Sequence, residues 1–128
     1  MTIQVTVIHG DLVLEKDTIF KNSIRVEGDI VGKDGKKYNL KVKGNIVASG
    51  DICTWNITSS GRIYAWNIVA SGDITALRKI DSQFINANGN IKADFIVCGQ
   101  LKQPEGKKLV CKNLIETYGT YKLKEVKR

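Results

Sequence analysis

Four aspartates are the residues of this chain whose type and placement come closest to a catalytic or metal-binding set. Asp29, Asp51 and Asp73 each follow a glycine directly, and Asp94 lies further along the chain. Carboxylates that share one face can serve as general acid and base or hold a divalent cation. Asp and Asn also hydrogen-bond their own backbone at tight corners. Amide side chains fill the slot after glycine elsewhere, at Asn45, Asn90 and Gln100. We therefore expect corner-forming roles for the aspartates.

The other groups that could carry chemistry are few. His9 is the single histidine, so a nucleophile–histidine arrangement would have to be built around it, and we expect a surface or turn role instead. Cys53, Cys98 and Cys111 are odd in number and are never spaced as Cys-x-x-Cys, which indicates buried thiols without a disulfide or zinc. The sequence predicts no enzyme, no catalytic residue, no cofactor and no metal.

One aromatic cluster could bind a ligand. Trp55 and Trp66 are both followed by asparagine, and Tyr64 lies nearby. Sugar rings or nucleic acid bases could stack on these rings. Corner packing or a protein contact would explain them as well, and the sequence leaves open whether each ring points inward or outward.

The elements that must position these residues form a repeat. Eight of the twelve glycines begin a Gly-x-Ile or Gly-x-Leu triplet. In the middle of the chain IVASGDICTWN (46–56), ITSSGRIYAWN (57–67) and IVASGDITALR (68–78) follow one another directly, with a period of eleven.

Aliphatic anchors recur through the chain at steps of six or five residues. A helical stripe needs steps of three and four, so the spacing favours a solenoid of short parallel strands with one aliphatic side chain per side pointing into a common core. The series is Ile46, Ile52, Ile57, Ile63, Ile68, Ile74, Ile80, Ile85, Ile91, Ile96 and Leu101. Val7, Val13, Ile19, Ile24 and Ile30 continue it upstream.

The number of sides decides which anchors stack. Three sides give coils of about 16–17 residues, roughly seven coils in all, and the columns Ile46/Ile63/Ile80, Ile52/Ile68/Ile85/Leu101 and Ile57/Ile74/Ile91. Two-sided coils of eleven residues would also stack isoleucine on isoleucine. We favour three sides, which place the two tryptophans on different sides; a two-sided coil would stack them.

Two polar segments interrupt the repeat. One lies near 31–39 and the other at 102–108, and both are predicted to be loops that leave a corner of a single solenoid domain spanning 1–121. After the second loop Leu109, Ile115 and Tyr121 resume the six-residue step, and 122–128 is expected to be a frayed basic tail.

Charge is unevenly distributed along the chain. The formal net charge is +7, but residues 44–101 carry four basic and four acidic groups, so the excess belongs to the two ends. This count predicts no basic groove along the coils and makes nucleic acid an improbable partner.

No apolar run reaches 18 residues and the first residues do not resemble a secretory signal, which predicts a cytoplasmic protein without a transmembrane segment.

The triplets, and VKGNIVASGDI and VASGDITA in particular, resemble the bactofilins, bacterial polymer-forming cytoskeletal proteins. The likeness covers residues 24 to about 101. It implies a right-handed, three-sided β-helix that polymerises end to end without nucleotide and acts as a scaffold. It also implies association with the membrane or with cell-wall proteins.

Three hypotheses follow for function. The first is a non-enzymatic structural protein that self-associates, because a solenoid ends in unpaired strands that need a cap or a neighbour. The alternative is a carbohydrate- or polyanion-binding module that uses the Trp55/Trp66 region. An acyltransferase or polysaccharide lyase is the least favoured, since the hexapeptide acyltransferases keep a strict six-residue step.

Overall fold

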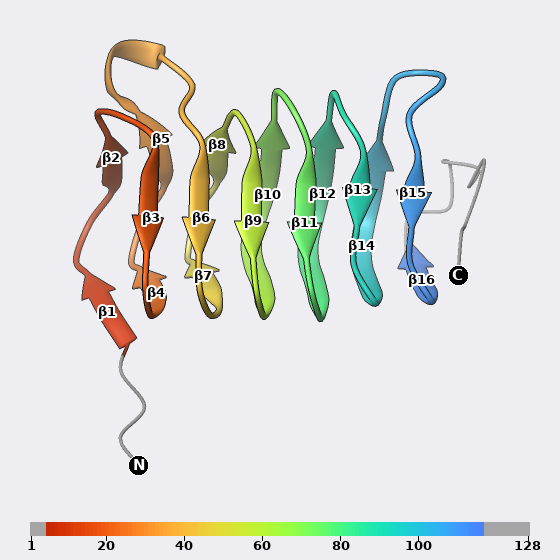
Figure 1. Cartoon of the computed structure of the whole chain (residues 1–128), viewed down its shortest axis with the longest axis horizontal. Coiled ribbons are helices and arrows are strands. Elements are labelled where there is room, and N and C mark those ends of the chain that lie inside the picture. The colour runs from red at the N-terminus through yellow and green to blue at the C-terminus, as the bar shows by residue number, and fades with distance from the viewer. Residues whose placement is uncertain (1–4, 117–128) are drawn as a thin grey trace.

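The chain folds into a three-sided parallel β-solenoid, as a computed structural model of residues 5–116 describes it (Figure 1). Side 1 contains β1 (Val5–Ile8), β4 (Ser23–Val26), β7 (Ile46–Ala48), the first halves of β10 (Arg62–Ala70), β12 (Lys79–Ala87) and β14 (Phe95–Lys102), and β16 (Asn113–Glu116). Side 2 contains β2 (Leu12–Leu14), β5 (Ile30–Gly32), β8 (Ile52–Thr54) and the second halves of β10, β12 and β14. Side 3 contains β3 (Thr18–Phe20), β6 (Leu40–Val42), β9 (Ile57–Ser59), β11 (Ile74–Ala76), β13 (Ile91–Lys92) and β15 (Leu109–Val110).

The strand register decides between three sides and two. Ile63 pairs with Ile46 and Ile80, and each of the other two predicted columns is paired in the same way. The three-sided prediction is therefore confirmed. We call the corner between sides 1 and 2 corner 1, that between sides 2 and 3 corner 2, and that between side 3 and the next coil corner 3.

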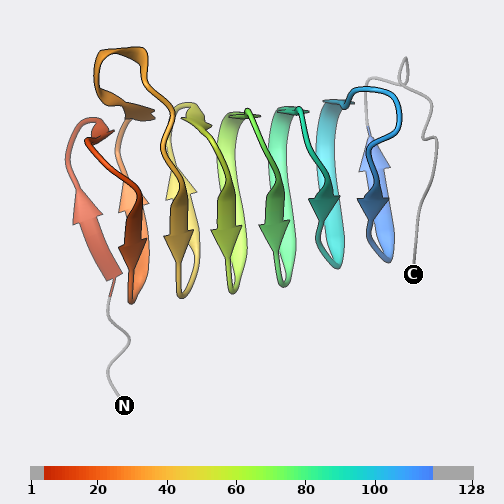
Figure 2. The same cartoon turned by 45° about the horizontal axis from the view of Figure 1, so that its top comes forward.

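Six complete coils and the first strand of a seventh lie within the described residues. In Figure 1 the near strands of side 3 point down, the strands behind them point up, and the chain advances from left to right, so the coil is right-handed. Both predicted loops leave corner 2 (Figure 1 and Figure 2). The first includes a 3-10 turn at Lys33–Gly35, in which Asp34 has a φ of 56°.

The core is built from two inward positions per strand. The first is large, and all eleven anchors from Ile46 to Leu101 are fully buried. The second is mostly small in the middle and C-terminal coils, whereas the first two coils hold the larger Leu14, Val26 and Val42 at this position. Its buried occupants in the middle and C-terminal coils include Ala48, Thr54, Ser59, Ala70, Ala76, Ser82, Ala87, Ala93, Cys98 and Cys111.

The first coil differs from the sequence prediction. Val7, Val13 and Ile19 were predicted to be core anchors, but they point outward and are 46%, 48% and 64% exposed. The residues that pair with the inner columns are Thr6, Leu12 and Thr18. The prediction failed because side chains alternate along a strand, and apolar residues occupy both faces of this coil, so spacing alone cannot choose the frame.

A similar shift occurs after the second loop. Leu109 pairs with Ile91 and is buried as predicted, but Leu114 pairs with Ile96 in place of Ile115, whose partner is Val97. Tyr121 and the tail 122–128 lie outside the described residues.

Candidate interaction surfaces

The four aspartates do not converge. Asp29 and Asp51 lie at corner 1, Asp73 lies at corner 2, and Asp94 lies at corner 3 beside Lys112, with 4.0 Å between Oδ2 and Nζ. Within residues 5–116 no group of three or more histidine, cysteine or acidic side chains could hold a metal ion. Of the four aspartates, only Asp29 and Asp51 are neighbours, in successive coils at corner 1.

The aspartates instead join one coil to the next. Asp29 Oδ1 accepts a hydrogen bond from the backbone N–H of Asp51 at 2.8 Å, and Asp11 Oδ1 accepts one from Asp29 N–H at 2.8 Å. At corner 2 Asp73 Oδ1 accepts from Asn90 N–H at 2.8 Å. Asx residues thus form ladders that run along the corners, parallel to the solenoid axis. The predicted corner role holds, but the hydrogen bonds cross between coils and do not return to the residue's own turn.

The asparagines make hydrogen bonds of the same kind between coils, Asn45 at corner 3 and Asn90 at corner 2. Asn45 Oδ1 accepts from Arg62 N–H at 2.9 Å, and Asn90 Oδ1 accepts from Lys108 N–H at 2.9 Å. Gln100 also follows a glycine, but it lies within β14 and pairs with Phe84. The sequence around it does not distinguish it from the two asparagines at corners, because all three follow a glycine.

His9 lies at corner 1, where its Nδ1 is 2.6 Å from Glu27 Oε1. The histidine side chain is 80% exposed. An exposed ion-pair geometry of this kind contributes little to stability. The predicted surface location is what the structure describes.

The aromatic residues lie at separate places. Trp55 is at corner 2, between β8 and β9, and Trp66 is at corner 1, in the middle of β10. Both rings point into solvent, with exposed fractions of 49% and 60%. Tyr64 lies on side 1, with Lys79 Nζ 6.0 Å from its ring centre. The three residues therefore do not form one aromatic surface.

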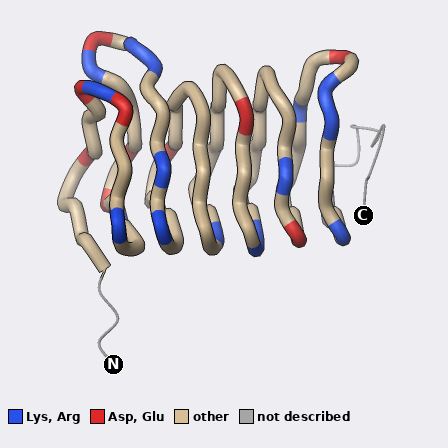
Figure 3. The backbone as a smooth tube through the Cα atoms, in the orientation of Figure 1, with Lys and Arg blue, Asp and Glu red and all other residues tan. Residues whose placement is uncertain are grey.

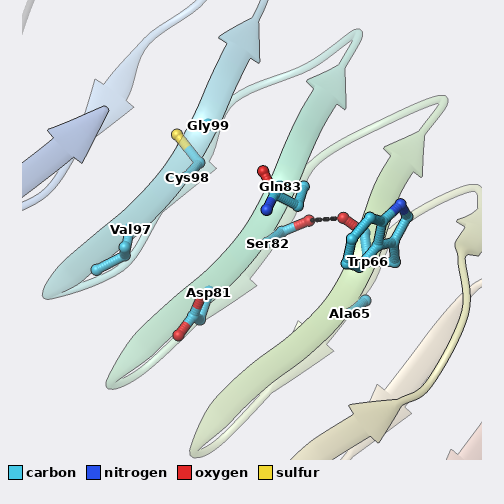
Figure 4. A pocket seen from close by; sticks show the side chains of 8 residues that line it. All are labelled: Ala65, Trp66, Asp81, Ser82, Gln83, Val97, Cys98 and Gly99. Carbon is cyan, nitrogen blue, oxygen red and sulfur yellow. Dashed lines mark hydrogen bonds between the residues drawn. The ribbon is translucent and has the colours of Figure 1, made fainter. Parts of the chain in front are cut away.

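A shallow groove of about 330 Å³ lies beside Trp66 (Figure 4). Trp66, Gln83 and Gly99 occupy the same corner position in three successive coils, and the groove opens where glycine supplies no side chain. Asp81 and Gln83 place polar groups in its wall. Ser82 Oγ donates to the carbonyl oxygen of Trp66 at 3.0 Å and holds the two strands together below the ring.

The first coil presents an apolar outer surface. Val5, Val7, Val13 and Ile19 all point outward and are roughly half exposed or more. The next coil holds Arg25 opposite Val7 and Lys41 opposite Ile19. Within the described residues β1, β2 and β3 each pair with one strand only. Coil 1 thus combines three strand edges without a second partner among the described residues with an apolar exterior; the following coil replaces this exterior with charge at two positions and keeps an apolar residue, Val31, opposite Val13.

Charged residues are segregated by corner. The acidic groups Asp11, Glu27, Asp29 and Asp51 lie at corner 1, while Lys21, Lys43, Arg62 and Arg78 follow corner 3 (Figure 3 shows the basic residues recurring along the lower edge). The even charge count of residues 44–101 hides this separation. The sequence prediction concerned a basic groove along the coils, and it stays a prediction; the basic residues form an exposed row at corner 3, which also holds Asp94.

Fold and surfaces together define a single-chain parallel β-solenoid with an open, apolar first coil. Comparison with known proteins finds no family model, no curated relative and no solved structure that matches the chain. None of the described residues belongs to a helix long and apolar enough to span a bilayer.

Proposed function

We propose that this protein is a structural, non-enzymatic protein that self-associates through its first coil. The observation that carries the proposal is the exposed apolar ring of Val5, Val7, Val13 and Ile19 on a coil with open strand edges. Unpaired edge strands bind further strands unless charge, proline or a cap prevents it. The four side chains lie on the three sides of one coil, so each side presents apolar surface at this end of the solenoid.

The resemblance to bactofilins supports the same role. It implies a cytoskeletal scaffold in the bacterial cytoplasm that polymerises by joining coil ends. Membrane or cell-wall proteins would then be partners of the assembled polymer. Enzymatic activity, a cofactor and a bound metal form no part of this proposal.

The test uses substitutions that the next coil already tolerates. Val7→Arg with Ile19→Lys copies the residues found in register at Arg25 and Lys41, so the strands should be preserved. Leu77→Lys is the control for placing a cation on an exposed apolar residue outside coil 1, because Leu77 is 58% exposed but lies at corner 3 between β11 and β12.

Sedimentation velocity and negative-stain electron microscopy should show oligomers or rods for the natural chain and for the control, and monomers for the double variant. Circular dichroism checks that all three share one fold. A strict monomer at high concentration in low and physiological salt would contradict the proposal, as would unchanged assembly in the double variant.

A second candidate function rests on the groove beside Trp66. An exposed indole next to a carboxylate and an amide is a suitable surface for a sugar ring, which needs an apolar platform and hydrogen-bonding edges. In a glycan array Trp66→Ala should lose binding and Trp55→Ala, at another corner, should keep it. Equal binding by both variants would remove this candidate.

A further inference from the structure

A row of exposed basic side chains follows corner 3 through four successive coil junctions. Lys21 joins coils 1 and 2, Lys43 joins coils 2 and 3, Arg62 begins β10 in coil 4, and Arg78 precedes β12 in coil 5. Backbone hydrogen bonds hold these junctions in step: Lys43 N–H donates to the carbonyl of Phe20, and Arg78 N–H donates to that of Gly61. The next junction holds Asp94, so the uninterrupted basic row ends there (Figure 3).

An acidic row follows corner 1 over coils 1 to 3. It consists of Asp11, Asp29 and Asp51, with Glu27 beside the middle one, and none of the described residues of this corner is lysine or arginine. Asp11 and Glu27 are exposed, and Asp29 and Asp51 are partly exposed. The ladder bonds to backbone N–H groups fix the first two aspartates at one position per coil.

Both rows take one residue from each successive coil, and adjacent parallel strands lie about 4.7–4.9 Å apart. Asp11, Asp29 and Asp51 stand at one register position, and so do Lys21 and Lys43, whereas Arg62 is in register with Lys79 and Arg78 with Gly61. Two rows of opposite sign with one charge per coil come opposite each other when two solenoids lie side by side and are displaced by a whole number of coils. Binding of a flexible polyanion to the basic row would not require an acidic row elsewhere on the same protein. A second copy of this chain, in contrast, always brings its own acidic row at corner 1.

We propose that a second copy of this chain docks its acidic corner 1 against the basic corner 3 of the first, so that solenoids associate side by side. The contact is heterologous, since each copy keeps one row unused, and it therefore continues into sheets or bundles without closing into a dimer. Exposed ion pairs contribute little individually. Many pairs act together only when copies are already joined end to end, and in that respect the inference rests on the proposed function.

The experiment compares two variants of equal net charge. Lys21→Gln, Lys43→Gln and Arg78→Gln remove three of the four basic side chains of the row, while Lys36→Gln, Lys107→Gln and Lys108→Gln remove three exposed charges from the loops at corner 2. Electron microscopy at 25 mM and 500 mM NaCl should show natural rods bundled in low salt and separate in high salt. The corner 2 variant should behave in the same way. The corner 3 variant should give single rods at both salt concentrations.

A second measurement separates this inference from end-to-end assembly. The row substitutions are placed in the Val7→Arg/Ile19→Lys background, and the second virial coefficient of the monomers is measured by static light scattering in 25 mM NaCl. The corner 2 version should be more attractive than the corner 3 version, and 500 mM NaCl should abolish the difference.

Three results would overturn side-by-side docking. The first is equal virial coefficients for the two versions, and the second is bundling that the corner 3 variant retains. The third is a natural chain whose rods stay single in low salt while corner 3 binds heparin or phosphatidylglycerol vesicles, which would assign the row to a polyanion or a lipid surface. If the natural chain forms no rods but the two versions still differ in virial coefficient, end-to-end assembly would be contradicted. The side-by-side contact would still be supported by that result.

Discussion

Asn56 lies over Gly72 of the next coil and occupies the space that a side chain at residue 72 would need. Asn56 Oδ1 accepts a hydrogen bond from the backbone N–H of Asp73 at 2.7 Å, and a Cβ added at Gly72 would overlap that oxygen and lie 3.1 Å from Asn56 Cγ. Asp29 has the same relation to Gly50, and Asp73 has it to Gly89. The Gly-Asx pair therefore acts between coils: the glycine of one coil makes room for the Asx side chain of the coil before it.

Gly72→Ala should destabilise the protein, because the methyl group and Asn56 cannot both keep their positions. We expect the free energy of unfolding to fall by about 1–3 kcal/mol, the usual cost of overpacking. Urea denaturation followed by tryptophan fluorescence measures it. In an Asn56→Ala background the obstacle is gone, so the same substitution should cost distinctly less. Equal costs in the two backgrounds would show that the overlap is relieved elsewhere.

The corner ladder predicts a difference between removing and conserving an acceptor. Asp73→Ala leaves Asn90 N–H without its acceptor and should lower the free energy of unfolding by about 0.5–1.5 kcal/mol, whereas Asp73→Asn keeps an oxygen in place. Asp94→Ala serves as the control, because its contact is a 4.0 Å approach of exposed groups. If Asp73→Ala and Asp94→Ala cost the same, the ladder bond would carry no particular weight.

Thr54 holds a buried hydroxyl whose Oγ1 has no hydrogen-bond partner among the described residues. Thr54→Val keeps the shape and removes the unsatisfied oxygen, so the free energy of unfolding should rise by about 1 kcal/mol. Ser59 is the matched contrast: its Oγ donates to the Gly44 carbonyl at 2.6 Å and accepts from Gly61 N–H at 3.1 Å.

Ser59→Ala should therefore lower the free energy of unfolding by about 1–3 kcal/mol, since it leaves buried backbone groups unpaired. The same denaturation series measures both variants. A loss of stability in Thr54→Val would mean that its hydroxyl is satisfied in solution, for example by a bound water.

The three thiols should differ in accessibility. Cys53 is partly exposed on side 2, with Lys37 Nζ 2.6 Å from its Sγ, while Cys98 and Cys111 are 2% exposed in the core. Under native conditions an aromatic disulfide reagent should react rapidly with one thiol per chain, and in denaturant with three. Mass spectrometry identifies the labelled residue, and Cys53→Ser should abolish the rapid phase. Rapid labelling of all three native thiols would contradict the burial of the two core cysteines.

The regular middle of the solenoid was predictable because its pattern leaves one consistent solution. From Ile46 to Ile96 each side carries an isoleucine, and the residue two positions after it is small, so the same frame buries the isoleucines in every coil. The first coil offered no such choice, because Val7 and Ile8 are both apolar and alternate sides of the strand.

The candidate surfaces were less predictable for a different reason. The apolar exterior of coil 1 becomes visible only when Val7 is placed opposite Arg25 and Ile19 opposite Lys41. That placement requires knowing which alternate residues of each strand face the core. The aromatic residues were found by type, but the number of sides decides whether Trp55 and Trp66 meet.

By itself, the sequence determined the repeat, the parallel solenoid and the identity of the core column, since side-chain period and glycine spacing are local properties of the chain. Only the tertiary structure decided which residues of one coil lie next to which residues of the following coil. Asn56 and Gly72, or Lys21 and Lys43, come together because strand pairing brings residues 16 to 22 positions apart into register. Coil length varies with each loop, so that register, and with it the separation of acidic and basic corners, follows from the folded coil and not from the order of charges along the chain.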